Sequence, residues 1–236
     1  MRESWAGVGN GRGLHTAGLA APLCFGVIDI KPLGQRGADG RVEGDSLPVI
    51  TALARHAGLA FEPRLQPLAR GMRELAQQRC DLFMALPVAV PDPAVRSLGP
   101  LAYGEVVLVP RAGMAPPKDG NWQGLRVVSL VGGVAWGPRI AIGPVEKVQV
   151  VSLPAMVAML KAGRADAAVG LRATLEYTLR QAGYGPQDFG PMQSLGKLPL
   201  LLYAGAQVDA ATADKLRAAA QAVLMAGEAD AMVRPR

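Results

Sequence analysis

One short phrase occurs twice along the chain and constrains its fold more than any other feature. The copies are residues 75–81 and residues 160–166, 85 positions apart (160 − 75), and both read Leu-x-x-x-Arg-x-Asp before a run of apolar residues. This pattern is typical of a helix that leads through a tight turn into a buried strand. Its repetition predicts two similar α/β lobes rather than one continuous domain. Clefts between two such lobes are where small ligands bind.

The two aspartates of the repeated phrase are interpreted as structural residues. Asp81 and Asp166 stand at the amino-terminal ends of the expected strands. Ligands of open α/β sheets bind beyond the opposite, carboxyl ends of the strands. We therefore expect turn residues here rather than a catalytic pair of carboxylates.

Hydrophobic patterning extends the repeated phrase into alternating strands and helices. An apolar strand at 23–28 precedes an amphipathic helix that ends at Gly58 in a left-handed conformation. An edge-type strand with Pro63 and a helix from Pro67 complete the first unit. This order is typical of an open sheet with helices on both faces. The second unit comprises strands at 125–131, near 148–151 and after residue 166, with helices from 154 and at 171–182, before a final helix at 210–225.

Extended segments flank the second unit, at 102–109 and at 197–203. If both cross between the lobes, the chain enters the second lobe once and returns once, so the helix at 210–225 must pack on the first lobe. Two crossing strands form a hinge that suits a closing clamp. We expect two sheets rather than one continuous sheet. The predicted divisions are a disordered tail at 1–21, lobe 1 at 22–103 plus 205–236, and lobe 2 at 104–204.

Charge and composition exclude several classes of function. The net charge is +6, but the basic residues are scattered and aromatic residues make up only 5% of the chain, whereas a nucleic-acid surface shows a clustered basic footprint. The longest apolar runs have the length of strands, so we expect no membrane span. The two histidines and two cysteines do not match zinc-site spacing, and no motif indicates a cofactor. We interpret His56 as a cation near a helix C-terminus.

The two cysteines and the N-terminal segment leave alternatives open. Cys24 and Cys80 fall at the starts of predicted strands, and an even count permits one disulfide without requiring it; otherwise both are small buried apolar residues. Residues 1–21 are rich in glycine and lack the continuous apolar stretch of a secretory signal. Either the protein is cytoplasmic, or the start of the chain is truncated or misassigned.

Several short phrases follow one another in a defined order, at residues 25–29, 39–41, 67–70, 79–81, 100–103 and 162–170. Their order and spacing resemble the periplasmic solute-binding proteins of the amino-acid type, family 3 of the substrate-binding proteins of ABC transporters. The resemblance covers the chain from Leu23 onward. It implies an α/β fold of two lobes with two hinge crossovers, the type 2 periplasmic-binding fold. In that fold the first and third strands are adjacent, so we expect Cys24 and Cys80 to lie close together, bonded only in an oxidising compartment.

The chain departs from the amino-acid binders of this family at three positions, one of which is Leu33, where those proteins often carry an aromatic residue after the first strand. Those proteins carry an arginine shortly after the third strand that clamps the ligand carboxylate, whereas Arg96 comes a few positions late. They carry an aspartate for the ligand ammonium where this chain has Leu171. A ligand of anionic or apolar character is therefore easier to accommodate than an ordinary α-amino acid. The expected ligand-binding residues are Asp29, Leu33, Arg70, Leu86, Arg96, Gly132, Gly133, Trp136 and Arg172.

The expected function is reversible binding of a small polar or anionic molecule between the lobes, for an ABC-type uptake system or as an orphan sensor. The resemblance implies a periplasmic monomer with a small-molecule ligand and without a cofactor, a metal or a nucleic-acid partner. A membrane permease is the other partner it allows, and the sequence leaves that partner open.

Two other classes of function are kept as alternatives. Some proteins of this fold are dehydratases that act on cyclic acids, and such chemistry needs a placed acid or base. Glu105, Glu176 and Asp29 are the candidates, but they form no convincing catalytic constellation in the sequence. Cytoplasmic effector-binding domains of transcription factors share the fold as well. No helix-turn-helix precedes Leu23, which counts against that alternative.

Overall fold

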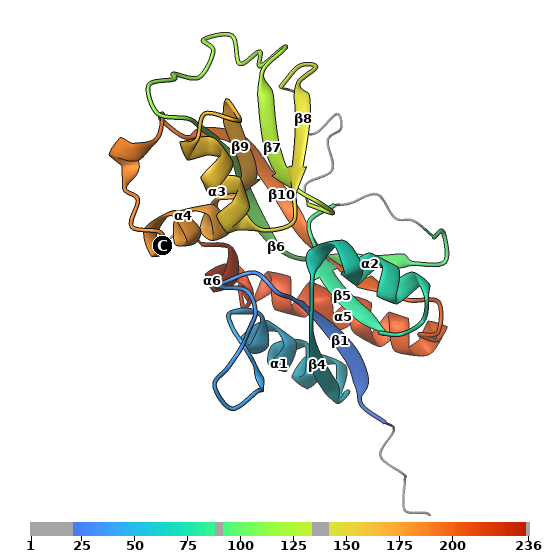
Figure 1. Ribbon diagram of the computed structural model, residues 1–236. Coiled ribbons are helices and arrows are strands. Elements are labelled where there is room, and N and C mark those ends of the chain that lie inside the picture. Colours follow the sequence, from blue (N-terminus) through green and yellow to red (C-terminus); the bar gives the residue numbers. More distant parts are fainter. Residues whose placement is uncertain (1–20, 88–91, 134–141, 235–236) are drawn as a thin grey trace, which may run out of the picture.

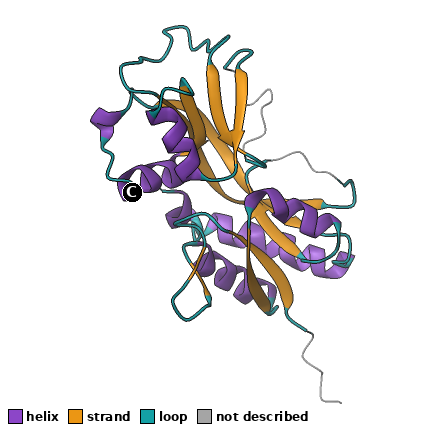
Figure 2. Ribbon diagram, in the orientation of Figure 1, coloured by secondary structure: helices purple, strands orange, loops and turns teal. Residues whose placement is uncertain are grey.

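The computed structural model describes residues 21–87, 92–133 and 142–234, and its main strands form an eight-stranded sheet (Figure 1). The predicted disordered tail lies outside the described residues, except for its last residue. Helices pack on both faces of the sheet (Figure 2). The strand order is β4 (Phe61–Gln66), β1 (Leu23–Ile28), β5 (Leu82–Ala85), β10 (Gln193–Ala204), β6 (Arg96–Pro110), β9 (Ala167–Leu171), β7 (Arg126–Leu130) and β8 (Glu146–Val150).

The two longest strands, β6 and β10, connect the two halves of the molecule (Figure 1). They pair antiparallel from one end of β10 to the other. Residues 201–204 of β10 also pair with β5, and residues 106–110 of β6 pair with β9. The predicted hinge crossovers are therefore confirmed, but the expectation of two separate sheets was wrong. Because the crossovers pair along their length, they carry one hydrogen-bonded ladder from one half of the molecule to the other.

Lobe 1 is the half of the molecule built around the parallel strands β1, β4 and β5. Helices α1 (Ser46–Ala57) and α5 (Ala210–Met225) pack against each other and share one apolar core with the sheet. Helix α2 (Leu68–Ala76) covers the other face, where its Leu75 packs in a second core with Phe83. Helix α5 thus returns to lobe 1, as the two crossovers require.

Lobe 2 is the other half, built around β7, β8 and β9. Helices α3 (Leu153–Lys161) and α4 (Arg172–Gln181) bury one face of these strands. The opposite face holds the fully buried Trp122, packed with Val127 and Val169. The predicted boundaries between the lobes, at 103/104 and 204/205, stay predictions.

Short elements complete the fold. Strands β2 (Gln35–Arg36) and β3 (Val42–Glu43) form a hairpin between β1 and α1. The 3-10 helix η1 (Pro186–Asp188) lies between α4 and β10, and helix α6 (Asp230–Val233) follows α5. Helix α1 ends at Gly58 with φ 63°, as predicted, because glycine adopts the left-handed conformation without a steric penalty.

Each aspartate of the repeated phrase fastens its strand to a neighbouring strand. Asp81 Oδ2 accepts a 2.8 Å hydrogen bond from the backbone N–H of Cys24, at the start of β1. Asp166 Oδ2 accepts a 2.9 Å bond from the backbone N–H of Arg126, at the start of β7. Cys24 is also joined to Cys80 by a disulfide, and the two Cα atoms lie 5.0 Å apart. The aspartates therefore have the structural role that the sequence predicted.

Candidate functional site

A pocket lies between the two lobes, where the carboxyl ends of their strands face each other. Ile28 ends β1, Leu130 ends β7 and Leu171 ends β9, and all three line the pocket. Ligands of open α/β sheets bind beyond these ends of the strands. The space in it that water-sized groups can enter measures about 70 Å³, and the surrounding hollow, which opens to solvent, brings the total to about 590 Å³. Its lining comprises Ile28, Ile30, Leu33, Leu68, Leu86, Leu130, Gly132, Gly133, Leu153, Val169, Gly170, Leu171, Thr174 and Leu200.

The lobes approach each other closely beside Gly132, at the wall of the pocket. A Cβ atom at Gly132 would lie 2.9 Å from the Cα atom of Ala69, in the first turn of α2. Gly132 also has φ 72°, in the left-handed region that favours glycine. Both the contact and the backbone conformation therefore require glycine here. The loop after β7 in lobe 2 rests directly against α2 in lobe 1.

The described lining of the pocket is almost entirely aliphatic. Its one hydroxyl belongs to Thr174, whose Oγ1 already donates a 2.9 Å hydrogen bond to the carbonyl oxygen of Leu171. No charged side chain of the described residues lines the pocket. Apolar side chains come from both lobes, as with Leu33 and Leu68 from lobe 1 and Val169 from lobe 2. The walls therefore offer dispersion contacts and little hydrogen bonding.

Four of the predicted ligand-binding residues line this pocket: Leu33, Leu86, Gly132 and Gly133. The structure brings the first two from lobe 1 together with the glycine pair from lobe 2. A fifth, Trp136, lies outside the described residues. The predicted residues that line the pocket are thus two leucines and two glycines. Their part in ligand binding is still a prediction.

The charged members of the predicted set lie elsewhere. Asp29 and Arg70 are exposed and do not line the pocket. Arg96 stands at the start of β6, where its Nη2 donates a hydrogen bond to the carbonyl oxygen of Val208, just before α5. This contact ties a crossover strand to the returning chain, so Arg96 stabilises the return to lobe 1.

Arg172 forms ion pairs with two carboxylates beside the hinge. Its Nη1 lies 3.0 Å from Glu105 Oε2, on crossover strand β6, and its Nε lies 2.7 Å from Glu176 Oε1, one turn along α4. The hydrogen bonds to Glu176 and Glu105 raise the pKa of Arg172 above its ordinary value. Arg172 and Glu176 line a second hollow, on lobe 2 between α4 and the segment 184–192. The guanidinium is therefore already neutralised by protein carboxylates.

The three carboxylates considered for catalysis do not meet in the pocket. Asp29 is exposed, and Glu105 and Glu176 both bind Arg172. A hydrogen bond from Ser194, together with Arg172, lowers the pKa of Glu105 although partial burial opposes the shift. A carboxylate with a lowered pKa stays ionised near neutral pH and is a poor general acid.

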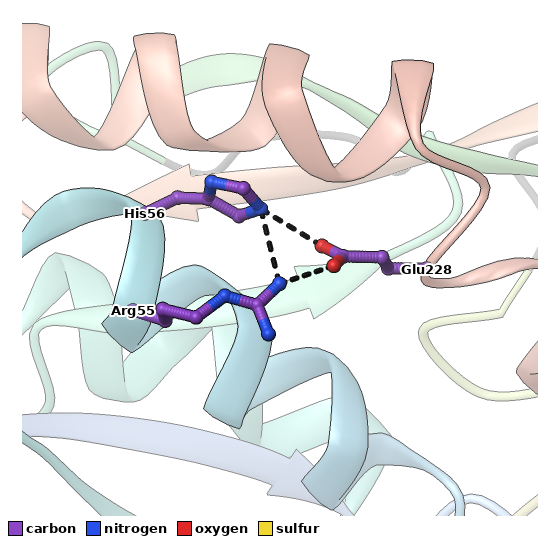
Figure 3. A network of polar contacts seen from close by, with 3 residues as sticks. All are labelled: Arg55, His56 and Glu228. Atoms are coloured by element: carbon purple, nitrogen blue, oxygen red, sulfur yellow. Dashed lines mark hydrogen bonds and ion pairs between the residues drawn. The ribbon is translucent and has the colours of Figure 1, made fainter.

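A separate polar network joins α1 to the turn between α5 and α6 (Figure 3). His56 Nε2 lies 2.9 Å from Glu228 Oε2, and Arg55 Nη2 bonds the other carboxylate oxygen. Burial alone would raise the pKa of Glu228, but the hydrogen bonds from His56 and Arg55 outweigh it and lower that pKa. None of the three residues lines the interlobe pocket. Together they connect two helices of lobe 1, and His56 is part of this link.

Sequence reasoning missed most of the apolar lining. Ile30, Leu68, Leu130, Val169 and Leu200 look like ordinary core residues in the sequence, and only their position at a lobe surface distinguishes them. One signal was available, because Leu130 closes an expected strand and residues just beyond the carboxyl ends of strands face the ligand site. Applied to every expected strand, this rule would have added Ile30 and Leu68, but not Val169 and Leu200, which lie inside strands β9 and β10.

Among the described residues, no group of three or more histidine, cysteine, aspartate or glutamate side chains is arranged to hold a metal ion. None of the helices described is long and apolar enough to cross a membrane.

No protein-family model and no curated protein sequence matches the chain. Solved structures do match. The GluR0 ligand-binding core in complex with L-glutamate has a TM-score of 0.72 and 16% identity, over 92% of this chain and 100% of that chain. An ABC uptake transporter substrate-binding protein from Streptococcus pneumoniae with bound histidine has a TM-score of 0.69 and 19% identity, over 88% of both chains.

A third match is AncCDT-1, an ancestral amino-acid-binding protein described as a precursor of cyclohexadienyl dehydratase. Its TM-score is 0.67 at 16% identity, over 89% of this chain and 93% of that chain. All three matches extend over both lobes and the crossover strands. At such identities the likeness is one of fold, and it agrees with the topology and with the resemblance drawn from the sequence. The chain therefore has the two-lobed α/β fold of the periplasmic solute-binding proteins.

Proposed function

We propose that the chain is a solute-binding protein, which captures a small molecule between its lobes and closes on it without changing it chemically. One observation carries the proposal: residues of both lobes line one pocket, at the carboxyl ends of β1, β7 and β9. That is the position at which open α/β sheets bind ligands.

The connection between the lobes supports a closing movement. Among the described residues, the sheet passes from one lobe to the other only through the paired strands β6 and β10. A two-stranded connection bends more easily than a packed interface, and hinge closure around a ligand is a common use of such a connection. Closure of the lobes would first press Gly132 against Ala69, where the two lobes already lie close together.

The proposed setting is the periplasm, with a membrane permease of an ABC-type uptake system as partner, or a sensory role without one. The disulfide between Cys24 and Cys80 supports an oxidising compartment, because such bonds are rare where thiols are kept reduced. We also propose that the protein acts as a monomer. The substrate-binding protein from Streptococcus pneumoniae supports the uptake role by likeness of fold.

Catalysis is the second candidate function, and one structural neighbour favours it. AncCDT-1, which shares the fold, is described as a precursor of a dehydratase. Against it, Glu105 and Glu176 bind Arg172 rather than facing the pocket. A turnover screen with cyclic acids distinguishes the two: release of product by catalytic amounts of protein would replace binding with an enzymatic function.

The binding function is tested by thermal unfolding in the presence of amino acids, organic acids and polyamines. A ligand at a hundred times its dissociation constant adds about 2.7 kcal/mol to the free energy of unfolding. The test variant is Leu68→Trp, which places an indole in the pocket, and it should abolish the stabilisation. The matched control is Leu59→Trp, at another partly buried leucine outside the pocket, and it should preserve the stabilisation. A ligand that protects both variants equally binds elsewhere, and the proposal then fails.

A further inference from the structure

We infer that the interlobe pocket takes the hydrocarbon part of its ligand, so that the ligand is a small molecule with an apolar body rather than a compact zwitterion such as glutamate or arginine. This inference rests on the proposed binding function and adds the chemical class of the ligand. It replaces the polar or anionic ligand expected from the sequence.

Both lobes contribute apolar side chains to the pocket wall. Leu33, Leu68 and Leu86 come from lobe 1, and Leu130, Val169 and Leu171 come from β7 and β9. A ligand enclosed between such walls loses its contact with water on both sides. Transfer of a hydrocarbon surface into that setting is favourable, whereas an unpaired charge carries a large desolvation cost.

The polar groups near the pocket already have partners within the protein. The hydroxyl of Thr174 is committed to the carbonyl oxygen of Leu171. The guanidinium of Arg172, next along the chain, is held by two carboxylates. A compact zwitterion needs partners for a carboxylate and for an ammonium group, and the described lining supplies a charged side chain for neither.

The apolar wall also determines which ligands the pocket selects. A site built to pair with charges rejects ligands that lack them, since its own buried polar groups would be left unpaired. The part of this pocket that the structure describes has the opposite character: none of its lining side chains is charged, so none is left unpaired when an apolar molecule enters. Affinity should therefore follow the size of the apolar body and depend little on the charge of a head group at the mouth.

The experiment measures dissociation constants of the full chain by isothermal titration calorimetry. The probes are unbranched alcohols from butanol to heptanol, with the carboxylates and the alkylammonium ions of the same chain lengths. We expect affinity to rise about fourfold per methylene group, which corresponds to about 0.8 kcal/mol. The slope should be similar for all three head groups. L-glutamate, L-arginine and L-histidine should bind far more weakly than the longest probes.

Two variants assign this binding to the pocket. Leu68→Asn and Leu130→Asn keep the side-chain size but make one wall of each lobe polar, and each should lower affinity for heptanol about tenfold. Leu47→Asn is the matched control, because Leu47 is also a partly buried leucine near the start of a helix but does not line this pocket. It should leave the affinity unchanged, with folding of all variants checked by circular dichroism.

The outcomes separate the inference from the function on which it rests. Tight binding of a charged amino acid, with no dependence on chain length in the probe series, overturns the apolar ligand and leaves solute binding intact. Alcohol binding that Leu68→Asn and Leu130→Asn do not weaken overturns the assignment to this pocket. If neither the probes nor any solute of the thermal screen binds, both the inference and the proposed function fail.

Discussion

The two copies of the repeated phrase make the same backbone junction and reinforce it in different ways. In lobe 1 the backbone N–H of Asp81 donates a hydrogen bond to the carbonyl oxygen of Cys24. In lobe 2 the backbone N–H of Asp166 donates one to the carbonyl oxygen of Arg126. In each case the aspartate side chain accepts the N–H of the same partner. The hydrogen bonds that align neighbouring strands are thus common to both lobes.

The reinforcement differs because the residues beside the aspartates differ. Lobe 1 has Cys80 before its aspartate and links it covalently to Cys24. Lobe 2 has Ala165 at that position, and its aspartate instead forms ion pairs with Arg111 and Arg126. The comparison teaches that the junction is set by the aspartate and the tight turn, while a disulfide or ion pairs are added to it.

Loss of the disulfide should have the largest effect on stability. The bond closes a loop between residues 56 positions apart, and the chain-entropy model assigns about 4 kcal/mol to a loop of this length. The double variant Cys24→Ala/Cys80→Ala should lose about that much free energy of unfolding in a urea titration. Wild-type protein measured with excess reductant should lose a similar amount. A loss under about 1 kcal/mol would show that the bond contributes little to lobe 1.

The comparison can be sharpened by moving the bond to lobe 2. Arg126 and Ala165 occupy the positions that Cys24 and Cys80 occupy in lobe 1, because Arg126 exchanges the matching hydrogen bonds with Asp166. We expect Arg126→Cys/Ala165→Cys to form a disulfide on oxidation, detectable as the loss of two free thiols by mass spectrometry. Two free thiols after oxidation would contradict the equivalence of the junctions.

Removal of either aspartate should have the next largest effect. Asp81→Ala and Asp166→Ala each leave a backbone N–H without its acceptor, which costs about 1–3 kcal/mol. Asn variants should recover most of the loss, since the amide oxygen accepts the same bond. Only the deficit of Asp166→Asn should shrink in high salt, because only Asp166 pairs with two arginines. The deficit of Asp81→Asn comes from the lost hydrogen bond of Gln207 to Asp81 Oδ1 and should not depend on salt. Equal, salt-independent deficits in the two lobes would refute the assigned ion pairs.

Much of the fold could be predicted because its signals are local. The left-handed cap at Gly58 and the strands after Asp81 and Asp166 each depend on a few adjacent residues. The positions of the crossover strands were predicted, but their ends were not. An extended segment was expected at residues 102–109, whereas β6 spans Arg96–Pro110. Pairing with β10 sets that length, and such pairing joins distant parts of the chain. For the same reason the continuous sheet was not foreseen.

The site was less predictable because it depends on how two lobes face each other. Leu33 and Leu86 were reached through resemblance, whereas Leu200 has the same local pattern as any buried crossover residue. Arg172 looked like an anion ligand by its position after β9. Its partner Glu105 lies 67 residues earlier in the chain, so no local pattern reveals that its charge is already paired.

The turn before each Arg-x-Asp sequence is the next point of comparison. Gln78 and Gly163 occupy the same position and both have left-handed backbones, with φ 56° and φ 66°. A residue with a side chain pays a conformational cost there that glycine avoids. Gln78→Gly should raise the free energy of unfolding by up to about 1 kcal/mol, and Gly163→Ala should lower it by about 1 kcal/mol. No atom lies within 4 Å of a Cβ at Gly163, so a larger loss in the urea titration would show that more than backbone conformation is involved.

The smallest effect should come from an ion pair that only lobe 1 possesses. Arg79 binds Glu74 through its Nε and Nη2 atoms, at 2.9 and 2.8 Å, whereas Met159 stands in the place of Glu74 before Arg164. The hydrogen bond from Arg79 lowers the pKa of Glu74, although burial opposes the shift. A carboxyl group whose pKa is lower in the folded state stabilises the protein above its unfolded-state pKa and loses that contribution as pH falls through the folded value.

Glu74→Gln should therefore reduce stability slightly at pH 7 and have no effect at a pH below the folded-state pKa of Glu74. The two urea midpoints, compared across this range, measure the contribution of the pair. Arg164→Gln is the matched control in lobe 2. It should change the urea midpoint at neither pH, because residue 159, the counterpart of Glu74, is a methionine. If Arg164→Gln lowers stability as much as Glu74→Gln does, the ion pair of Arg79 and Glu74 does not distinguish lobe 1 from lobe 2. The two turns are then stabilised to a similar extent.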